Sequence, residues 1–488
     1  MTKSFEARRG LAAAFFRARG GPATNGRFRW KDRPLGRFTV RRYPVGCTPV
    51  SAGRSTARSR IATTVLALTA LSLVPVVIGT AGSAVAGTRC PSGATNVPHR
   101  AGRAPRVVGW LHSCRDGTIR TGKGQKIRLE GLEYFASAGG ATGAGACDGS
   151  PWFPPSYAGA DMRSWGFNEV ELFISWQNVE PKPPTRNAVT GRLVHHYDRT
   201  YLLKLDHAIA QFKQAGVAVV LVEQQARWSA AFQNIDGGYK VYKCGQGMPA
   251  WIYERDGKPA GGGAEMVRAE VNFFQNRKRV WNWGDPKPTV SEPIQTSFVK
   301  MWRFIAKRYR LNSTVVGVLP MWEPYDILTR NYPGASSVTR EMLHLARFFE
   351  VVGGAIHRVS PRVLLIFPEQ LSRRTGLWSL TRRPKVPNGV MGGEFYAKSW
   401  ATDGVTRMRL HVARAHNWHY PFDVDEFDAF GKTTNQPHTG WTESLAKMLT
   451  YCRKHHVSWT LLSYKGIVVP GSPHQANPEL LPIIRKGF

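Results

Sequence analysis

Eight short apolar runs alternate with helical patterns along most of this 488-residue chain. Near-continuous apolar runs separated by amphipathic stretches are typical of a parallel sheet whose two faces are covered by helices. Three of the intervening stretches, Tyr201–Gly216, Phe298–Tyr309 and Arg340–Val359, carry apolar residues at helical spacing. Eight such strands over about 340 residues predict an α/β fold, a single (β/α)8 TIM barrel with long loops. The predicted strands are Ile127–Leu132, Glu169–Ile174, Ala218–Glu223, Val315–Met321, Val363–Phe367, Val390–Phe395, Phe422–Phe427 and Ser458–Leu462.

Two long insertions rich in Gly and Trp, Ser137–Ser156 and Gly237–Pro288, follow the first and the third predicted strand. Both fall at the end of a barrel that carries the active site. The first strand is not followed by a G-x-G-x-x-G pattern, which disfavours a dinucleotide-binding sheet.

The front of the chain has the pattern of a secretory signal. The stretch Ile61–Ile78 is apolar and uncharged, several arginines precede it, and Ala84-Val85-Ala86 forms a small-x-small site. This pattern predicts cleavage after Ala86 and a secreted, extracellular protein. The alternative is an uncleaved signal that anchors the protein in a membrane, because the apolar stretch approaches the length that spans a bilayer.

We therefore expect four segments: a basic N-terminal extension (1–60), the signal h-region and cleavage site (61–86), a linker (87–110) and the barrel (111–488). The extension is either an unusually long n-region or untranslated, with the start at a Val codon near Val50. The formal net charge is +34, of which +13 belongs to residues 1–86 and +21 to the rest. No folded nucleic-acid reader adjoins the basic arm, so we predict no nucleic-acid partner. The charge of the body favours anionic cell-surface polymers, or it is an ordinary solvated basic surface.

The cysteines and histidines show no metal-binding spacing. Export permits disulfides, and the pairs Cys90–Cys114 and Cys147–Cys244 are candidates, although the sequence does not fix connectivity. Cys452 falls in a helical pattern and is expected to be a buried thiol. We predict neither a metal nor a cofactor, and the oligomeric state is not predictable.

Two glutamates, Glu323 in VVGVLPMWEP and Glu426 in PFDVDEF, stand at the carboxyl ends of predicted strands. A barrel brings such ends to one rim, although 103 residues separate the two in sequence. Paired carboxyl groups at one rim suit the cleavage of a glycosidic bond, because one protonates the leaving oxygen while the other attacks or activates water. A helix cap or a salt bridge would explain either glutamate alone equally well.

Several motifs, in order, resemble glycoside hydrolase family 5, the cellulase-like retaining hydrolases. The stretch WGFNEVELFISWQNVEP (Trp165–Pro181) resembles the second-strand signature of that family, and FVKMWRFIAKRYRLNSTVVGVLPMWEP (Phe298–Pro324) resembles the segment that delivers the acid/base. The resemblance covers nearly all of residues 115–466 and implies a family 5 barrel that acts on a carbohydrate substrate. It implies that Glu323 is the acid/base and Glu426 the nucleophile. We expect Glu323 to be the less solvated of the two.

The chain departs from the family pattern around the site, at five aligned positions. Trp322 replaces the Asn before the acid/base, Glu171 the strand-two Arg, Gln224 the strand-three His, Glu394 the strand-six His and Leu462 the strand-eight Trp. The nearby Tyr396 persists. The candidate substrate-binding residues are Trp322, Tyr396, Gln224, Trp228 and Glu394.

The sequence thus predicts a secreted retaining glycosidase that cleaves β-linked bonds in a polysaccharide, an oligosaccharide or a glycoconjugate. Two alternatives stay open: a non-catalytic glycan-binding barrel, and a cationic protein attached to the cell surface by its charge. The sequence does not identify the sugar, the linkage, or endo against exo action.

Overall fold

A computed structural model describes the chain from Cys90 onward, with gaps. The described residues are 90–93, 95–98, 100–135, 153–225, 228–232, 247–253, 263–276, 292–324, 338–371, 378–396, 404–428, 441–469 and 471–488. The predicted extension (1–60) and signal (61–86), most of both long insertions, and Cys147 and Cys244 lie outside these residues.

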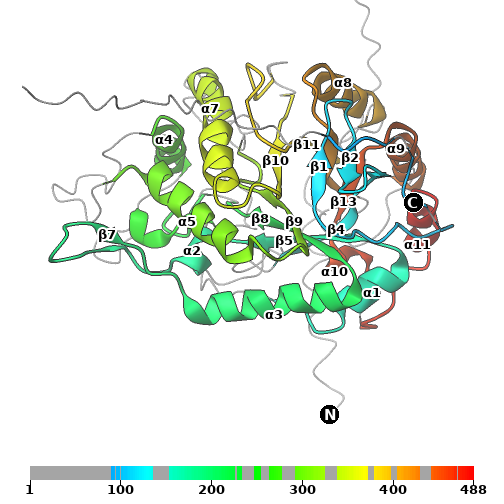
Figure 1. Ribbon diagram of the computed structural model, residues 1–488, viewed down its shortest axis with the longest axis horizontal. Helices are drawn as coiled ribbons and strands as arrows, with labels where there is room; N and C mark the ends of the chain where they lie inside the picture. Colours follow the sequence, from blue (N-terminus) through cyan, green and yellow to red (C-terminus); the bar gives the residue numbers. More distant parts are fainter. Residues whose placement is uncertain are drawn as a thin grey trace, which may run out of the picture. The chain divides into compact units, whose positions relative to one another are not determined.

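Eight parallel strands close into a barrel in the order β10-β11-β12-β13-β4-β5-β8-β9 (Figure 1), which confirms the predicted fold. The strands are β4 (Glu130–Phe135), β5 (Glu169–Ile174), β8 (Ala218–Glu223), β9 (Val315–Leu319), β10 (Leu364–Pro368), β11 (Gly389–Tyr396), β12 (Phe422–Asp428) and β13 (Ser458–Leu462). Three of them, β5, β8 and β13, have the bounds that their apolar runs predict.

The first barrel strand begins three residues later than predicted because Ile127 belongs to another sheet. An antiparallel sheet of β1 (Leu111–Ser113), β2 (Ile119–Thr121) and β3 (Lys126–Ile127) precedes the barrel. Leu111, Ile119 and Ile127 are buried in the same apolar cluster as the barrel-lining side chains of β8 and β9. The small sheet therefore closes the end of the barrel at which the strands begin.

Helices follow most strands, as expected for a barrel that alternates strand and helix. They are α1 (Ala158–Trp165), α2 (Trp176–Val179), α3 (Arg199–Ala215), α4 (Gly263–Phe274), α5 (Ile294–Tyr309), α7 (Val338–His357), α8 (Gly404–Asn417), α9 (Trp441–His455), α10 (Tyr464–Ile467) and α11 (Leu480–Arg485). The ends of α3 show why it forms where it does. The Asp198 carboxylate accepts the Tyr201 N–H at the start, and Gly216 ends the helix in the left-handed conformation that glycine adopts readily.

The segment before the barrel is tied to it. A disulfide joins Cys90 to Cys114, which confirms one of the two candidate pairs. The Val97 N–H donates to the Lys126 carbonyl of β3, and Ala104 is 1% exposed. The segment predicted as a linker (87–110) therefore contacts the domain at Cys90, Val97 and Ala104. Cys452 is a buried free thiol, as predicted. Among the described helices, none combines the length and the apolar character that crossing a membrane requires.

The barrel interior has an apolar half and an acidic half. The strands β8, β9 and β10 fill their side with Val220, Val316 and Leu364. On the other side, β5 contributes Glu169 and Glu171, each at most 1% exposed. Barrel interiors are ordinarily filled by branched aliphatic side chains, so carboxyl groups at these positions change the electrostatics of the whole core.

Candidate active site

The two predicted catalytic glutamates lie on strands that reach the same end of the barrel. Glu426 belongs to the last part of β12, and Glu323 follows the end of β9 by four residues. In the barrel β10 and β11 lie between these strands. Glu426 is 2% exposed, whereas Glu323 is partly exposed, so the expected order of solvation is reversed. The reason is local: Glu426 lies within a strand of the closed barrel, and Glu323 lies beyond the end of its strand.

The backbone at Glu323 is held in an unusual conformation. Its φ is 45°, in the left-handed region that residues other than glycine seldom adopt. The side-chain amide of Gln225, which is 1% exposed, donates to the carbonyls of both Trp322 and Glu323 at 2.6 Å. The Trp322 N–H in turn donates to the Glu223 carbonyl at the end of β8. Gln225 thus holds both peptide units that flank the α-carbon of Glu323. The sequence did not predict this role. The only signal was a pair of amides, Gln224-Gln225, directly after an apolar strand.

We expect Gln225→Met to lower kcat about tenfold with little change in KM, because a displaced catalytic group costs rate more than binding. Gln295→Met is the matched control, since Gln295 is also a buried amide that donates to a backbone carbonyl, that of Phe273 at 3.0 Å. Both variants should lose about 1 kcal/mol of unfolding free energy through the lost hydrogen bonds. Steady-state kinetics and thermal unfolding of both proteins test this; equal kcat losses in the two variants would show that Gln225 has no positioning role.

The two candidate sugar-stacking indoles have different surroundings. Trp322 is 8% exposed and meets Phe173 edge-on, with ring centroids 5.4 Å apart, within the cluster that lines the barrel. Trp228 is 1% exposed, and its indole N–H donates to the Tyr253 hydroxyl at 2.7 Å. Its edge-to-face contact with Phe273, at 5.1 Å, buries it further. This packing favours a structural role for Trp228; a sugar contact by either ring stays a prediction.

The other candidate binding residues surround the same rim. Glu394 of β11 is the register partner of Glu426 on the adjacent strand and is 7% exposed. Gln224 is 1% exposed, and its backbone N–H donates to the Ile174 carbonyl at the end of β5. Tyr396 ends β11, and its side chain lies outside what the structure describes. The structure therefore places Glu394 beside Glu426, while the binding roles of all three residues stay predictions.

A cluster of buried carboxyl groups lies in the barrel interior and continues toward Glu426. It comprises Glu169 and Glu171 of β5 with Asp423 and Asp425 of β12, all at most 1% exposed. The strands β5 and β12 are not neighbours in the barrel, so the interaction between their carboxyl groups runs across the interior. A Cβ at Gly131 of β4 would collide with the Glu169 carboxyl group, which occupies the space that this glycine leaves.

Burial and mutual repulsion favour the neutral forms of these acids. Burial first, then the neighbouring Glu169 and Asp423, raises the pKa of Glu171 well above its ordinary value. Burial, followed by Asp423 and Glu426, does the same to the pKa of Asp425. Burial raises the pKa of Asp423 to about 7. The sequence signal that we did not use was acidic residues at alternate positions of two barrel strands.

The described residues contain no group of three or more His, Cys, Asp or Glu side chains arranged to hold a metal ion. The described residues at the ends of the barrel strands supply carboxyl groups, amides and aromatic rings.

This architecture defines a (β/α)8-barrel protein with an acidic rim at the carboxyl ends of its strands. The family model for cellulase, glycosyl hydrolase family 5, matches residues 122–466. The chain belongs to glycoside hydrolase family 5, which supports glycoside hydrolase activity on a carbohydrate substrate.

Solved structures of similar fold include an endogalactoceramidase, with 20% identity and a TM-score of 0.55 over 75% of this chain and 77% of that one. Another is the lactosyl–enzyme intermediate of endo-glycoceramidase II from Rhodococcus sp. (20% identity, TM-score 0.53), where the match covers 78% of this chain and 81% of the other. No curated protein sequence matches the chain significantly. At this level of identity the similar structures support the fold.

Proposed function

We propose that this protein is a secreted retaining β-glycosidase in which Glu426 is the nucleophile and Glu323 the general acid/base. The observation that carries the proposal is the placement of both glutamates at the carboxyl ends of β12 and β9, inside the residues that match family 5. Retention requires the two carboxyl groups to act on opposite sides of one glycosidic bond, about 5–5.5 Å apart.

The proposed reaction has two displacements. In the first, the ionised Glu426 attacks the anomeric carbon, and Glu323 donates its proton to the departing oxygen. In the second, Glu323 removes a proton from water, which releases the sugar from Glu426. Burial, followed by the neighbouring Asp423 and Glu426, raises the pKa of Asp425 and so favours the neutral form of the acid next to Glu426.

For the substrate we propose a β-linked glycan or glycoconjugate. The similar structures are named as enzymes of glycoceramides, and one of them is a lactosyl–enzyme intermediate, the kind of species that double displacement forms. Trp322 stands where the family has an Asn, and an indole offers one donor and no acceptor. The contact with the sugar 2-hydroxyl must therefore differ from the family pattern.

The test is turnover by the exported protein, which we propose begins at Gly87 after cleavage behind Ala86. The panel contains aryl β-glucoside, aryl β-lactoside, a soluble β-glucan and lactosylceramide in detergent. Hydrolysis of at least one is expected. Binding of these glycans without any turnover would favour the alternative of a non-catalytic glycan-binding barrel. Absence of both binding and turnover would favour the alternative of a cationic protein attached to the cell surface.

A further inference from the structure

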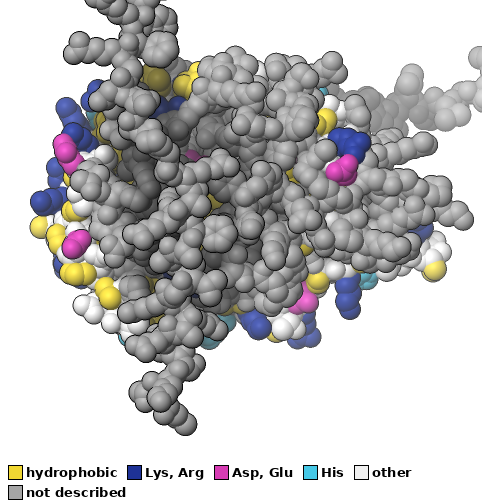
Figure 2. Space-filling model, turned by 180° about the vertical axis from the view of Figure 1, so that it is seen from behind, with side chains coloured by type: hydrophobic (Ala, Val, Ile, Leu, Met, Phe, Trp, Pro, Cys, Tyr) yellow, Lys and Arg dark blue, Asp and Glu magenta, His cyan; other side chains and the backbone are white. Residues whose placement is uncertain are grey.

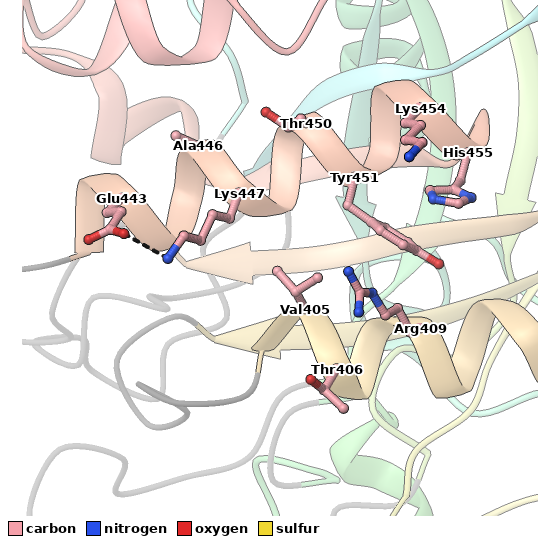
Figure 3. A pocket seen from close by; sticks show the side chains of 10 residues that line it. All are labelled: Val405, Thr406, Arg409, Glu443, Ala446, Lys447, Thr450, Tyr451, Lys454 and His455. Atoms are coloured by element: carbon pink, nitrogen blue, oxygen red, sulfur yellow. Dashed lines mark ion pairs between the residues drawn. The ribbon is translucent and has the colours of Figure 1, made fainter.

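A groove of about 530 Å³ runs between α8 and α9 on the outside of the barrel. Figure 3 shows its lining side chains, which come from the first part of α8 and from nearly the full length of α9. Glu443 and His455, at the two ends of the groove along α9, are 12 residues apart, which corresponds to about 18 Å along a helix axis. Neither Glu323 nor Glu426 lines the groove, so it is separate from the candidate active site.

The groove is cationic. Its lining carries three Lys and Arg residues, Arg409, Lys447 and Lys454, and one acidic residue, Glu443. That glutamate is already paired with Lys447, at 2.7 Å. Burial first, and then the neighbouring Lys454 and Arg409, hold the pKa of His455 below its ordinary value. Lys and Arg side chains also appear at several places along the described edges of the face in Figure 2.

An aromatic ring lies among these cations. The Arg409 guanidinium lies 5.8 Å from the centroid of the Tyr451 ring, and the His455 ring stacks on Tyr451 with centroids 4.2 Å apart. Two hydroxyl side chains, Thr406 and Thr450, complete the polar lining. The groove thus offers cations for acidic groups, hydroxyls for hydrogen bonds and an aromatic surface for an apolar face.

We propose that this groove binds an acidic polysaccharide, a linear glycan whose sugars carry carboxylate groups. Arg and Lys recognise carboxylates, and an aromatic ring accepts the apolar face of a pyranose. The elongated shape favours a chain that lies along α9 over a bilayer, which would require a flat cationic face. Such binding would hold the enzyme on anionic material and does not depend on its catalytic activity.

The probe is polygalacturonate, with neutral dextran as the uncharged comparison. The variant Arg409→Glu/Lys454→Glu should weaken polygalacturonate binding at least tenfold in calorimetry at about 0.15 M salt, where distant charges are screened. The control Lys204→Glu/Lys213→Glu changes net charge equally on exposed positions of α3, which packs on the opposite side of the barrel, and should change affinity less than twofold. Dextran should not bind.

Tyr451→Leu tests the groove without a change of charge, and we expect about a fivefold loss of affinity, as for the loss of one ring contact. Turnover of a small aryl glycoside should be unaffected in all variants, so failure of this proposal is separate from failure of the proposed function. Equal losses of polygalacturonate affinity in the groove and control variants, or an unchanged affinity in Tyr451→Leu, would show that the binding is nonspecific charge attraction and would contradict the proposal. Retention on phosphatidylglycerol vesicles without polygalacturonate binding would assign the groove to a membrane instead.

Discussion

Replacing Glu426 by alanine is expected to lower kcat on every hydrolysed substrate by a factor on the order of 10⁴ or more, as for other covalent nucleophiles. Without this carboxylate no glycosyl–enzyme bond forms, and the adjacent Asp425 does not substitute for it, because Asp425 is fully buried in the barrel interior. Binding of the glycan should persist, so KM should change far less than kcat.

The loss of rate in Glu323→Ala should instead depend on the leaving group of the substrate. For an alkyl or sugar leaving group, we expect a loss of about 10³-fold, because the departing oxygen needs a proton. For a dinitrophenyl glycoside, which departs as a stable anion, the loss in the first step should nearly disappear. Kinetics on the two substrate types measure the difference.

Glu369→Gln is the matched control for both variants. Glu369 is another buried glutamate directly after a barrel strand, β10, and its carboxylate pairs with Arg414 at 3.0 Å. We expect this variant to be less stable but to keep kcat at temperatures where it is folded. If folded Glu369→Gln lost as much activity as Glu426→Ala, the result would contradict a specific catalytic role of Glu426.

The contribution of the buried acids to the stability of the protein is expected to fall as the pH rises from 5 to 9. The buried acids Glu169, Glu171 and Asp425 have raised pKa values in the folded state, so between pH 4.5 and those values the unfolded chain binds fewer protons than the folded one. The contribution of these acids to the unfolding free energy therefore decreases with pH across this window. His195 acts in the same direction: hydrogen bonds to Glu180 and Glu292 outweigh burial and raise its pKa to about 9. Its contribution is complete below about pH 6.5 and is lost as the pH passes 9.

Glu171→Gln isolates the acid cluster, because it removes one ionisable group and keeps the shape. We expect it to raise the unfolding free energy by about 1–4 kcal/mol at pH 8.5, as when other buried charged groups are replaced, and to have little effect at pH 4.5. His195 is present in both proteins, so its contribution to the unfolding free energy cancels when the two are compared. Denaturant unfolding of the wild type, Glu171→Gln and the exposed control Glu479→Gln at both pH values measures the difference. A parallel pH dependence of the wild type and Glu171→Gln would show that this carboxyl group is not held neutral.

The barrel was predictable because its strands are apolar runs with clear limits, and β5, β8 and β13 have the expected bounds. The error at β4 arose since Ile127 is as apolar as the strand that follows, and local pattern does not reveal that it pairs with Ile119 in another sheet. The two glutamates were predictable because strand ends meet at one rim. Gln225 was not, because its role is a contact between chain segments 97 and 98 residues apart.

The acid cluster was not predicted for a related reason. Acidic side chains in a strand ordinarily face water, and only the closed barrel shows that Glu171 and Asp425, from strands that are not adjacent, share one interior. Trp228 shows the opposite case. Its place after a strand favoured a sugar contact, whereas its ring is 1% exposed and packs on Phe273.

The covalent step at Glu426 is tested most directly by trapping. A 2-deoxy-2-fluoro-β-glycoside of the sugar that is hydrolysed fastest, with a good leaving group, is incubated with the exported protein and analysed by peptide mass spectrometry. We predict one added 2-fluoroglycosyl unit on the peptide that contains Glu426, and none in Glu426→Ala. Turnover without any adduct, or an adduct on a different residue, would contradict a retaining mechanism through Glu426.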